Sequence, residues 1–121
     1  RLMLSWERSK LCFWLEEMER LAGEASVSVS ALGEAGSGVV RAALGRAALE
    51  GRWLPRAVAS LREGLSAEGG YLVVERAPRE VKDEVDVWGP ISPDSLDIMK
   101  RMKRQFDPSG ILSPGRFVGG L

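Results

Sequence analysis

The sequence predicts an α+β fold in which two helices cover one face of an antiparallel sheet. The first observation is helical periodicity, because apolar side chains recur at three- and four-residue steps in residues 11–22 and again in residues 54–65. The second is alternation, because residues 26–32 alternate serine with apolar residues, as a half-buried strand does. The third is size, since 121 residues with 45% hydrophobic content suffice for one domain with one modest core.

The first half of the chain is predicted as helix, strand, hairpin loop and strand. The helix starts at Leu11 and stops at Gly23, a residue type that suits a helix C-terminus. The strand over 26–32 leads into the glycine-rich segment 33–38. That segment lacks the G-x-G-x-x-G spacing and the lysine of phosphate-binding loops, which favours a hairpin over a phosphate site. Residues 39–44 form the returning strand.

The second half begins with a connection over residues 45–51 that continues the strand or forms a turn. A second helix starts near Trp53, ends at the glycine pair 69–70, and is followed by a third strand over residues 71–76. The charged stretch 79–86 is predicted as a solvated loop, because no pattern in it indicates burial. A calcium loop is disfavoured there, since the required glycine and distal glutamate are missing.

With one strand added at the front, this order of elements is that of the ferredoxin-like βαββαβ fold. The added strand is absent, is weak within residues 1–6, or lies upstream of Arg1. We interpret residues 1–121 as a single domain with residues 88–121 as a C-terminal extension. Arg1 is not an initiator residue, so the chain is interpreted as a fragment of a longer protein.

The extension is predicted as a capped helix and two turns. Ser92 can cap the helix and Pro93 suits its first position. One helix face is apolar and much of the remainder is basic, through Lys100, Arg101, Lys103 and Arg104; the apolar face comprises Leu96, Met99, Met102 and Phe106. Residues 107–110 suit a type I turn, and residues 113–116, with proline then glycine at their centre, suit a type II turn.

Composition excludes several classes of function. The sequence contains no histidine, which excludes histidine-based acid–base catalysis, histidine-dependent triads and histidine metal sites within this chain. A net charge of zero indicates no general attraction to nucleic acid or to anionic membranes. The single cysteine, Cys12, cannot form an internal disulfide and fits a reducing compartment, so a cytoplasmic location is expected. No apolar run approaches the ~20 residues of a membrane span.

The end of the chain resembles a known family. The string F-D-P-S-G-I-L-S-P-G-R at residues 106–116, preceded by a basic helix, resembles the C-terminus of FAD-linked oxidases of the vanillyl-alcohol oxidase type. The strings V-D-V-W-G at 85–89 and G-G-Y-L-V-V-E-R at 69–76 are most similar to the smaller flavin subunit of bacterial glycolate oxidase. The resemblance covers roughly the last fifty residues.

This resemblance implies a cap domain that lies on the substrate side of FAD, with the FAD itself held mainly by a domain outside this chain. Pro114, Gly115 and Arg116 match the family's P-G-[KR] turn near the flavin, which makes Ser113, Gly115 and Arg116 candidate cofactor-binding residues. Many relatives have asparagine in place of Ser113, so a direct flavin contact there is in question. Trp88 and Lys103 are candidates for the substrate side or for an interface. No catalytic or metal-binding residue is assigned.

Two hypotheses follow. In the first, the chain is part of a subunit of an FAD-dependent 2-hydroxy-acid oxidoreductase of the glycolate type. It is inactive alone and accessory, because the histidines of the larger catalytic subunits are missing. Its partners are the FAD-binding domain, other glycolate oxidase subunits including an iron–sulfur subunit, and through them the inner membrane. Apolar surface left by a missing partner predicts self-association of this chain. In the second, the chain is a free-standing ferredoxin-like binding or assembly module without flavin.

Overall fold

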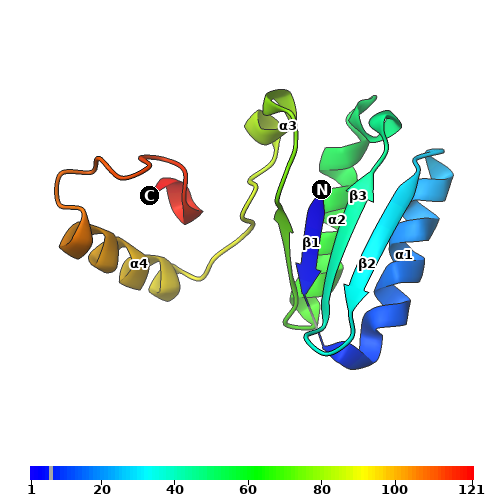
Figure 1. The fold of residues 1–121 in the computed structure, drawn as a ribbon, viewed down its shortest axis with the longest axis horizontal. Helices are drawn as coiled ribbons and strands as arrows, with labels where there is room; N and C mark the ends of the chain where they lie inside the picture. The colour runs from blue at the N-terminus through cyan, green and yellow to red at the C-terminus, as the bar shows by residue number, and fades with distance from the viewer. Residues whose placement is uncertain (6) are drawn as a thin grey trace. The chain divides into compact units, whose positions relative to one another are not determined.

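The computed structural model describes residues 1–5 and 7–121, and the sequence prediction for Trp6 lies outside these residues. They form two compact units, Arg1–Val87 and Trp88–Leu121 (Figure 1). The N-terminal unit contains β1 (Leu2–Ser5), α1 (Leu11–Glu24), β2 (Val29–Glu34), β3 (Val39–Leu44), α2 (Trp53–Ala67), β4 (Tyr71–Val74) and α3 (Arg79–Glu84). The C-terminal unit contains α4 (Pro93–Phe106).

The N-terminal unit has the strand order β2-β3-β1-β4, and every neighbouring pair is antiparallel. β1 lies in the middle of the sheet, with Leu4 opposite Val40 on one side and Leu72 on the other. This order, with a helix after β1 and another after β3, is the ferredoxin-like arrangement. Of the three alternatives for the first strand of the ferredoxin-like order, the structure therefore shows the second: the strand is β1, and it lies within residues 1–6.

One face of this sheet is buried against α1 and α2, which lie on the same side of it (Figure 1). Side chains alternate along each strand, so Leu2 and Leu4 are buried while Met3 and Ser5 are only half-buried. The helices contribute apolar residues at helical spacing: Trp14, Met18, Leu54, Val58, Leu61 and Leu65. The predicted α+β class, with two helices on one face of an antiparallel sheet, is confirmed.

The predicted end of α1 is wrong. The helix continues through Gly23 to Glu24, and the left-handed residue that ends it is Ser26, with φ of 54°. The amide of Val27 then donates to the carbonyl of Ala22 over 2.8 Å, which is the Schellman pattern. The end of α2 has the same pattern, but there Gly69 is the left-handed residue, as the glycine pair predicted.

The prediction of a half-buried strand over residues 26–32 also needs correction. β2 starts at Val29, and it is an edge strand whose residues are exposed apart from the half-buried Val29. Val27 is buried, but in a small separate cluster with Ala22 and Ala48. The serine–apolar alternation therefore reflects one buried contact before the strand rather than a buried strand face.

The charged stretch after β4 is helical rather than a loop. α3 covers Arg79–Glu84, and none of its residues is buried, so the predicted solvent exposure is correct and the predicted conformation is wrong. The amide of Val85 donates to the carbonyl of Val81, and Val85 is itself buried in the core. The buried Val85 thus anchors the end of α3, a short helix that the charged residues alone did not predict. β4 ends at Val74, two residues before the predicted end, and residues 46–49 form a 3-10 turn.

Candidate functional site

The C-terminal unit contains all five candidate residues, and its first part is α4. Ser92 caps the helix, because its Oγ accepts the amide hydrogen of Ser95 over 3.2 Å, and Pro93 occupies the first helical position. Asp94 in the first turn and Lys103 and Arg104 in the last turn complement the helix dipole. These features confirm the predicted start of the helix.

Asp107 fastens the end of α4 to the segment that follows. Its carboxylate is buried and accepts the amides of Ile111 at 2.9 Å and Leu112 at 3.0 Å. The ammonium of Lys103 lies 2.6 Å from the same carboxylate. The hydrogen bond from Lys103 is the main reason that the pKa of Asp107 lies below its usual value, and the two amides lower it further. The amide of Gly110 donates to the carbonyl of Asp107, which confirms the predicted turn.

Lys103 therefore has a structural partner. Its Nζ also donates to the carbonyl of Leu112, so the ammonium bridges the helix and the residue immediately before the second turn. The role predicted for Lys103, on the substrate side or at an interface, stays a prediction. The contacts of the side chain show that it at least shapes the turn that carries the other candidates.

The second turn has the predicted geometry. The amide of Arg116 donates to the carbonyl of Ser113 over 3.2 Å, and Gly115 has φ of 70°, as the third residue of a type II turn requires. Ser113 itself has φ of 46°, which is uncommon for serine and more often adopted by asparagine. The resemblance implies asparagine at this position in many relatives. The left-handed backbone conformation is one reason for that preference, beside any contact with a ligand.

Trp88 closes the C-terminal unit on itself. Its indole Nε1 donates to the carbonyl of Arg116 over 3.4 Å, and its ring packs edge-on against Phe117 with centroids 5.4 Å apart. A Cβ on Gly119 would lie only 2.5 Å from Cδ1 of Leu96, so the chain end passes very close to α4. Trp88 is 36% exposed. The structure thus brings Trp88 and the 113–116 turn together, although they are far apart in the sequence.

The guanidinium of Arg116 is exposed and, across residues 1–5 and 7–121, makes no hydrogen bond or ion pair. The backbone of the same residue is held at both its amide and its carbonyl. An arginine whose backbone is fixed and whose guanidinium N–H donors are unpaired can bind a carboxylate or a phosphate bidentately. Of the candidate residues, Arg116 therefore has the chemistry best suited to an anionic ligand.

α4 presents an apolar stripe to solvent. Ile98, Met102 and Phe106, at four-residue spacing, are 56%, 56% and 77% exposed. Leu96 and Met99, which the sequence analysis placed in one stripe with Met102 and Phe106, are instead half-buried. The apolar residues of α4 are thus divided between a partly covered side and an exposed side, which contains Ile98.

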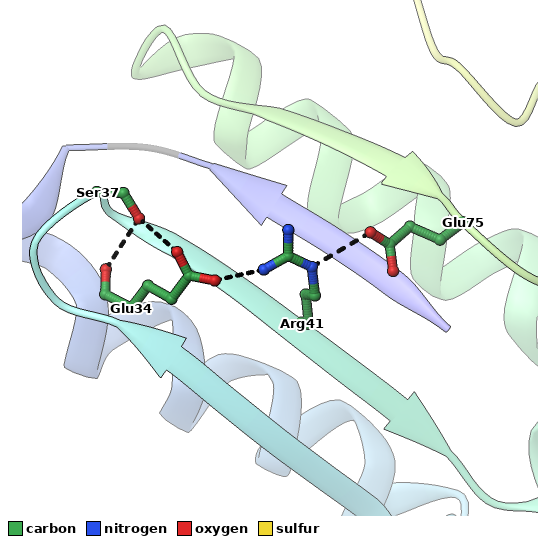
Figure 2. A network of polar contacts seen from close by, with 4 residues as sticks. All are labelled: Glu34, Ser37, Arg41 and Glu75. Carbon is green, nitrogen blue, oxygen red and sulfur yellow. Dashed lines mark hydrogen bonds and ion pairs between the residues drawn. The ribbon is translucent and has the colours of Figure 1, made fainter.

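The open face of the sheet in the N-terminal unit carries a polar network that the sequence analysis missed (Figure 2). Arg41 lies between Glu34 and Glu75, with Nε 3.3 Å from Oε1 of Glu75, and Ser37 Oγ donates to Glu34 (Figure 2). Hydrogen bonding to Glu34 raises the pKa of Arg41. The odd-numbered position of Arg41 in β3, opposite Leu32, is the sequence signal that could have placed it on this face. Its charge is balanced by two carboxylates, so the network suits structure better than catalysis.

The glycine-rich segment 33–38 contains the predicted hairpin loop, but the loop itself is residues 35–38, because Gly33 and Glu34 still belong to β2. Glu34 pairs with Val39 in the sheet, and the amides of Ser37 and Gly38 both donate to the carbonyl of Glu34. Amides that close a hairpin in this way do not form a phosphate cradle. Within the described ranges, no group of three or more potential metal ligands occurs, and no helix is long and apolar enough to cross a membrane.

Comparison with known proteins adds one finding. The family model described as FAD linked oxidases, C-terminal domain, matches residues 90–117. The matched segment contains α4, both turns and the candidates Lys103, Ser113, Gly115 and Arg116, while Trp88 lies just before it. No curated protein and no solved structure matches the chain. The match supports the predicted resemblance to the C-terminal domain of FAD-linked oxidases, and it does so for the segment in which the structure gathers the candidate residues.

Proposed function

We propose that this chain is the C-terminal, substrate-side part of an FAD-dependent oxidoreductase subunit that acts on 2-hydroxy acids of the glycolate type. The observation that carries the proposal is the family match over residues 90–117, together with the exposed, unpaired guanidinium of Arg116 within it. FAD, held mainly by a separate domain, would accept the electrons removed from the hydroxy acid. The chain alone is not a catalyst in this proposal.

The residues of the C-terminal unit fit a role beside a bound cofactor. Arg116 would bind an anionic group, either the carboxylate of the substrate or a phosphate of FAD. Gly115 leaves its side of the turn open, because nothing lies within 4 Å of the position that a Cβ would take. Ser113 would contribute a hydroxyl, while Trp88 and Lys103 hold the turn from its two ends. The partners are the FAD-binding domain, a second flavin subunit and an iron–sulfur subunit.

The test is replacement of Arg116 in the natural protein together with its FAD-binding part. Arg116→Gln should raise KM for the hydroxy acid at least about tenfold with unchanged flavin content if the guanidinium binds the substrate carboxylate. It should instead lower the flavin content if the guanidinium binds a phosphate. Arg104→Gln, at an exposed arginine of the same unit, is the matched control. Unchanged KM and flavin content in Arg116→Gln would refute this role of the turn.

The alternative is a free-standing binding or assembly module, and the complete ferredoxin-like sheet with its own core favours it. Such a module would pair through its sheet and bind no flavin. Purification of the natural protein with its partners separates the two proposals. A yellow, flavin-absorbing complex supports the oxidoreductase proposal. A natural protein that consists of this chain alone and purifies without any flavoprotein supports the proposal of a binding or assembly module.

A further inference from the structure

A pocket of about 410 Å³ opens at one end of the sheet in the N-terminal unit. It lies where β1 begins and where β3 and β4 end, and the 3-10 turn Arg46–Leu49 and the start of α2 complete its wall. The wall is mostly apolar and includes Leu2, Ala48, Leu54 and Val74, all of them buried core residues. A volume of this size is within the range of small-molecule sites.

Three arginines line the same pocket: Arg1, Arg46 and Arg76. All three are exposed, and no aspartate or glutamate is among the lining residues. Within residues 1–5 and 7–121 none of the three forms an ion pair, whereas Arg41 and Arg52 each have carboxylate partners. Glu75, beside Arg76 in the sequence, is already paired with Arg41. The pocket is thus a local excess of positive charge on a chain whose net charge is zero.

This combination defines the chemistry of a ligand. Apolar walls favour an aliphatic or aromatic body, and the exposed, unpaired guanidinium groups of the three lining arginines favour an anionic head. A bound anion would also relieve the repulsion between neighbouring arginines. We propose that this pocket binds a small amphipathic anion, with a carboxylate or phosphate head and an apolar body. The site contains none of the residues 90–117, and it does not depend on the function proposed above.

Nitrogen-15-labelled protein titrated with four probes tests the proposal. Octanoate and octyl phosphate carry the apolar body with the two possible heads, octanol carries the body without charge, and glycolate carries the charge without the body. Saturable shifts of the amides of Leu2, Ala48, Leu49 and Val74 are expected with octanoate or octyl phosphate, and the tighter of the two identifies the head. Octanol should bind at least about tenfold more weakly, because it lacks the charge-assisted bonds, and glycolate should leave these amides unshifted.

A charge-removing pair of substitutions provides the second measurement. Arg46→Gln with Arg76→Gln should weaken binding of the preferred anion at least about tenfold. Arg56→Gln, at an exposed arginine of α2 that does not line the pocket, should leave the affinity unchanged. The proposal is overturned if octanol binds as tightly as the anions, if the double variant binds as tightly as the control, or if the shifts fall on Ile98, Met102 and Phe106 instead.

Discussion

Asp107 shows how a single side chain organises the candidate site. Two backbone amides and the ammonium of Lys103 converge on its carboxylate at the end of α4. The carboxylate thereby places the chain between the two turns, and the second of these turns carries Arg116. The sequence indicated that an aspartate belongs at the first position of the turn, but it did not show that its side chain would be buried and bonded in this way.

The depressed pKa of Asp107 predicts how the C-terminal unit responds to acid. Because the folded-state pKa lies below the unfolded-state value of about 4, the carboxylate stabilises the unit fully above that pH. The contribution is lost as pH falls through the folded-state pKa. The amide resonances of Ile111 and Leu112 should titrate together, with a midpoint below the ordinary pKa of an aspartate side chain.

Asp107→Asn should abolish that titration and speed hydrogen exchange at both amides, because the amide side chain is a weaker acceptor and cannot pair with Lys103. Asp97→Asn, at an exposed aspartate within α4, serves as the control. Titration of the two amides at or above the ordinary aspartate pKa would contradict the role assigned to the carboxylate.

At the scale of elements, the two helices on the sheet make contact where the Trp14 ring of α1 packs against Gly64 of α2. A Cβ on this residue would lie 2.6 Å from Cη2 of Trp14, whose ring is buried against α2. Trp14 Nε1 also donates to Glu68 at the end of α2 over 3.2 Å. Gly64 is therefore a helix-interior glycine with a packing reason, since any side chain there displaces the tryptophan ring.

A matched pair of glycine substitutions tests this contact. Gly64→Ala should lower the free energy of unfolding, because overpacking costs roughly 1–3 kcal/mol and outweighs the gain in helix propensity of about 1 kcal/mol. Gly23→Ala in α1, where no atom lies within 4 Å of the added Cβ, should instead raise it by up to about 1 kcal/mol.

Urea denaturation followed by tryptophan fluorescence measures both effects. If Gly64→Ala stabilised the protein as much as Gly23→Ala does, the tight packing of the Trp14 ring on Gly64 would be disproved.

At the scale of the whole molecule, each of the two units has a different kind of surface. The N-terminal unit encloses its own core, whereas none of the residues of α4 in the C-terminal unit is buried. The exposed apolar stripe of Ile98, Met102 and Phe106 is typical of a protein–protein interface. In the proposed oxidoreductase, the covering surface belongs to the FAD-binding part or to a partner subunit.

The chain by itself should therefore self-associate through α4. Met102→Lys with Phe106→Lys should give a monomer at concentrations at which the unchanged chain forms larger species, because two charges in the stripe oppose its burial. Leu32→Lys, at a residue that is 69% exposed in the N-terminal unit, is the control and should leave association unchanged.

Sedimentation velocity over a range of concentrations measures the effect. A monomer at every concentration of the unchanged chain would remove the evidence for an uncovered apolar face.

Local sequence signals predicted much of the architecture. The start of α1 at Leu11, the bounds of β3, the start of α2 at Trp53 and the capped start of α4 follow from periodicity and capping residues. Both C-terminal turns follow from the positions of proline and glycine. The family resemblance over the last residues likewise depends on this local string, which the family match covers.

Tertiary contacts decided the remainder, because they override weak local preferences. Ser26 ends α1 in a conformation that Gly23 was expected to provide, since the buried Val27 fixes where the chain must turn. β2 is exposed because it lies at the edge of the sheet, a position that alternation alone does not reveal. The arginine-lined pocket and the contact between Trp88 and Arg116 join residues far apart in sequence, and only the folded chain brings them together.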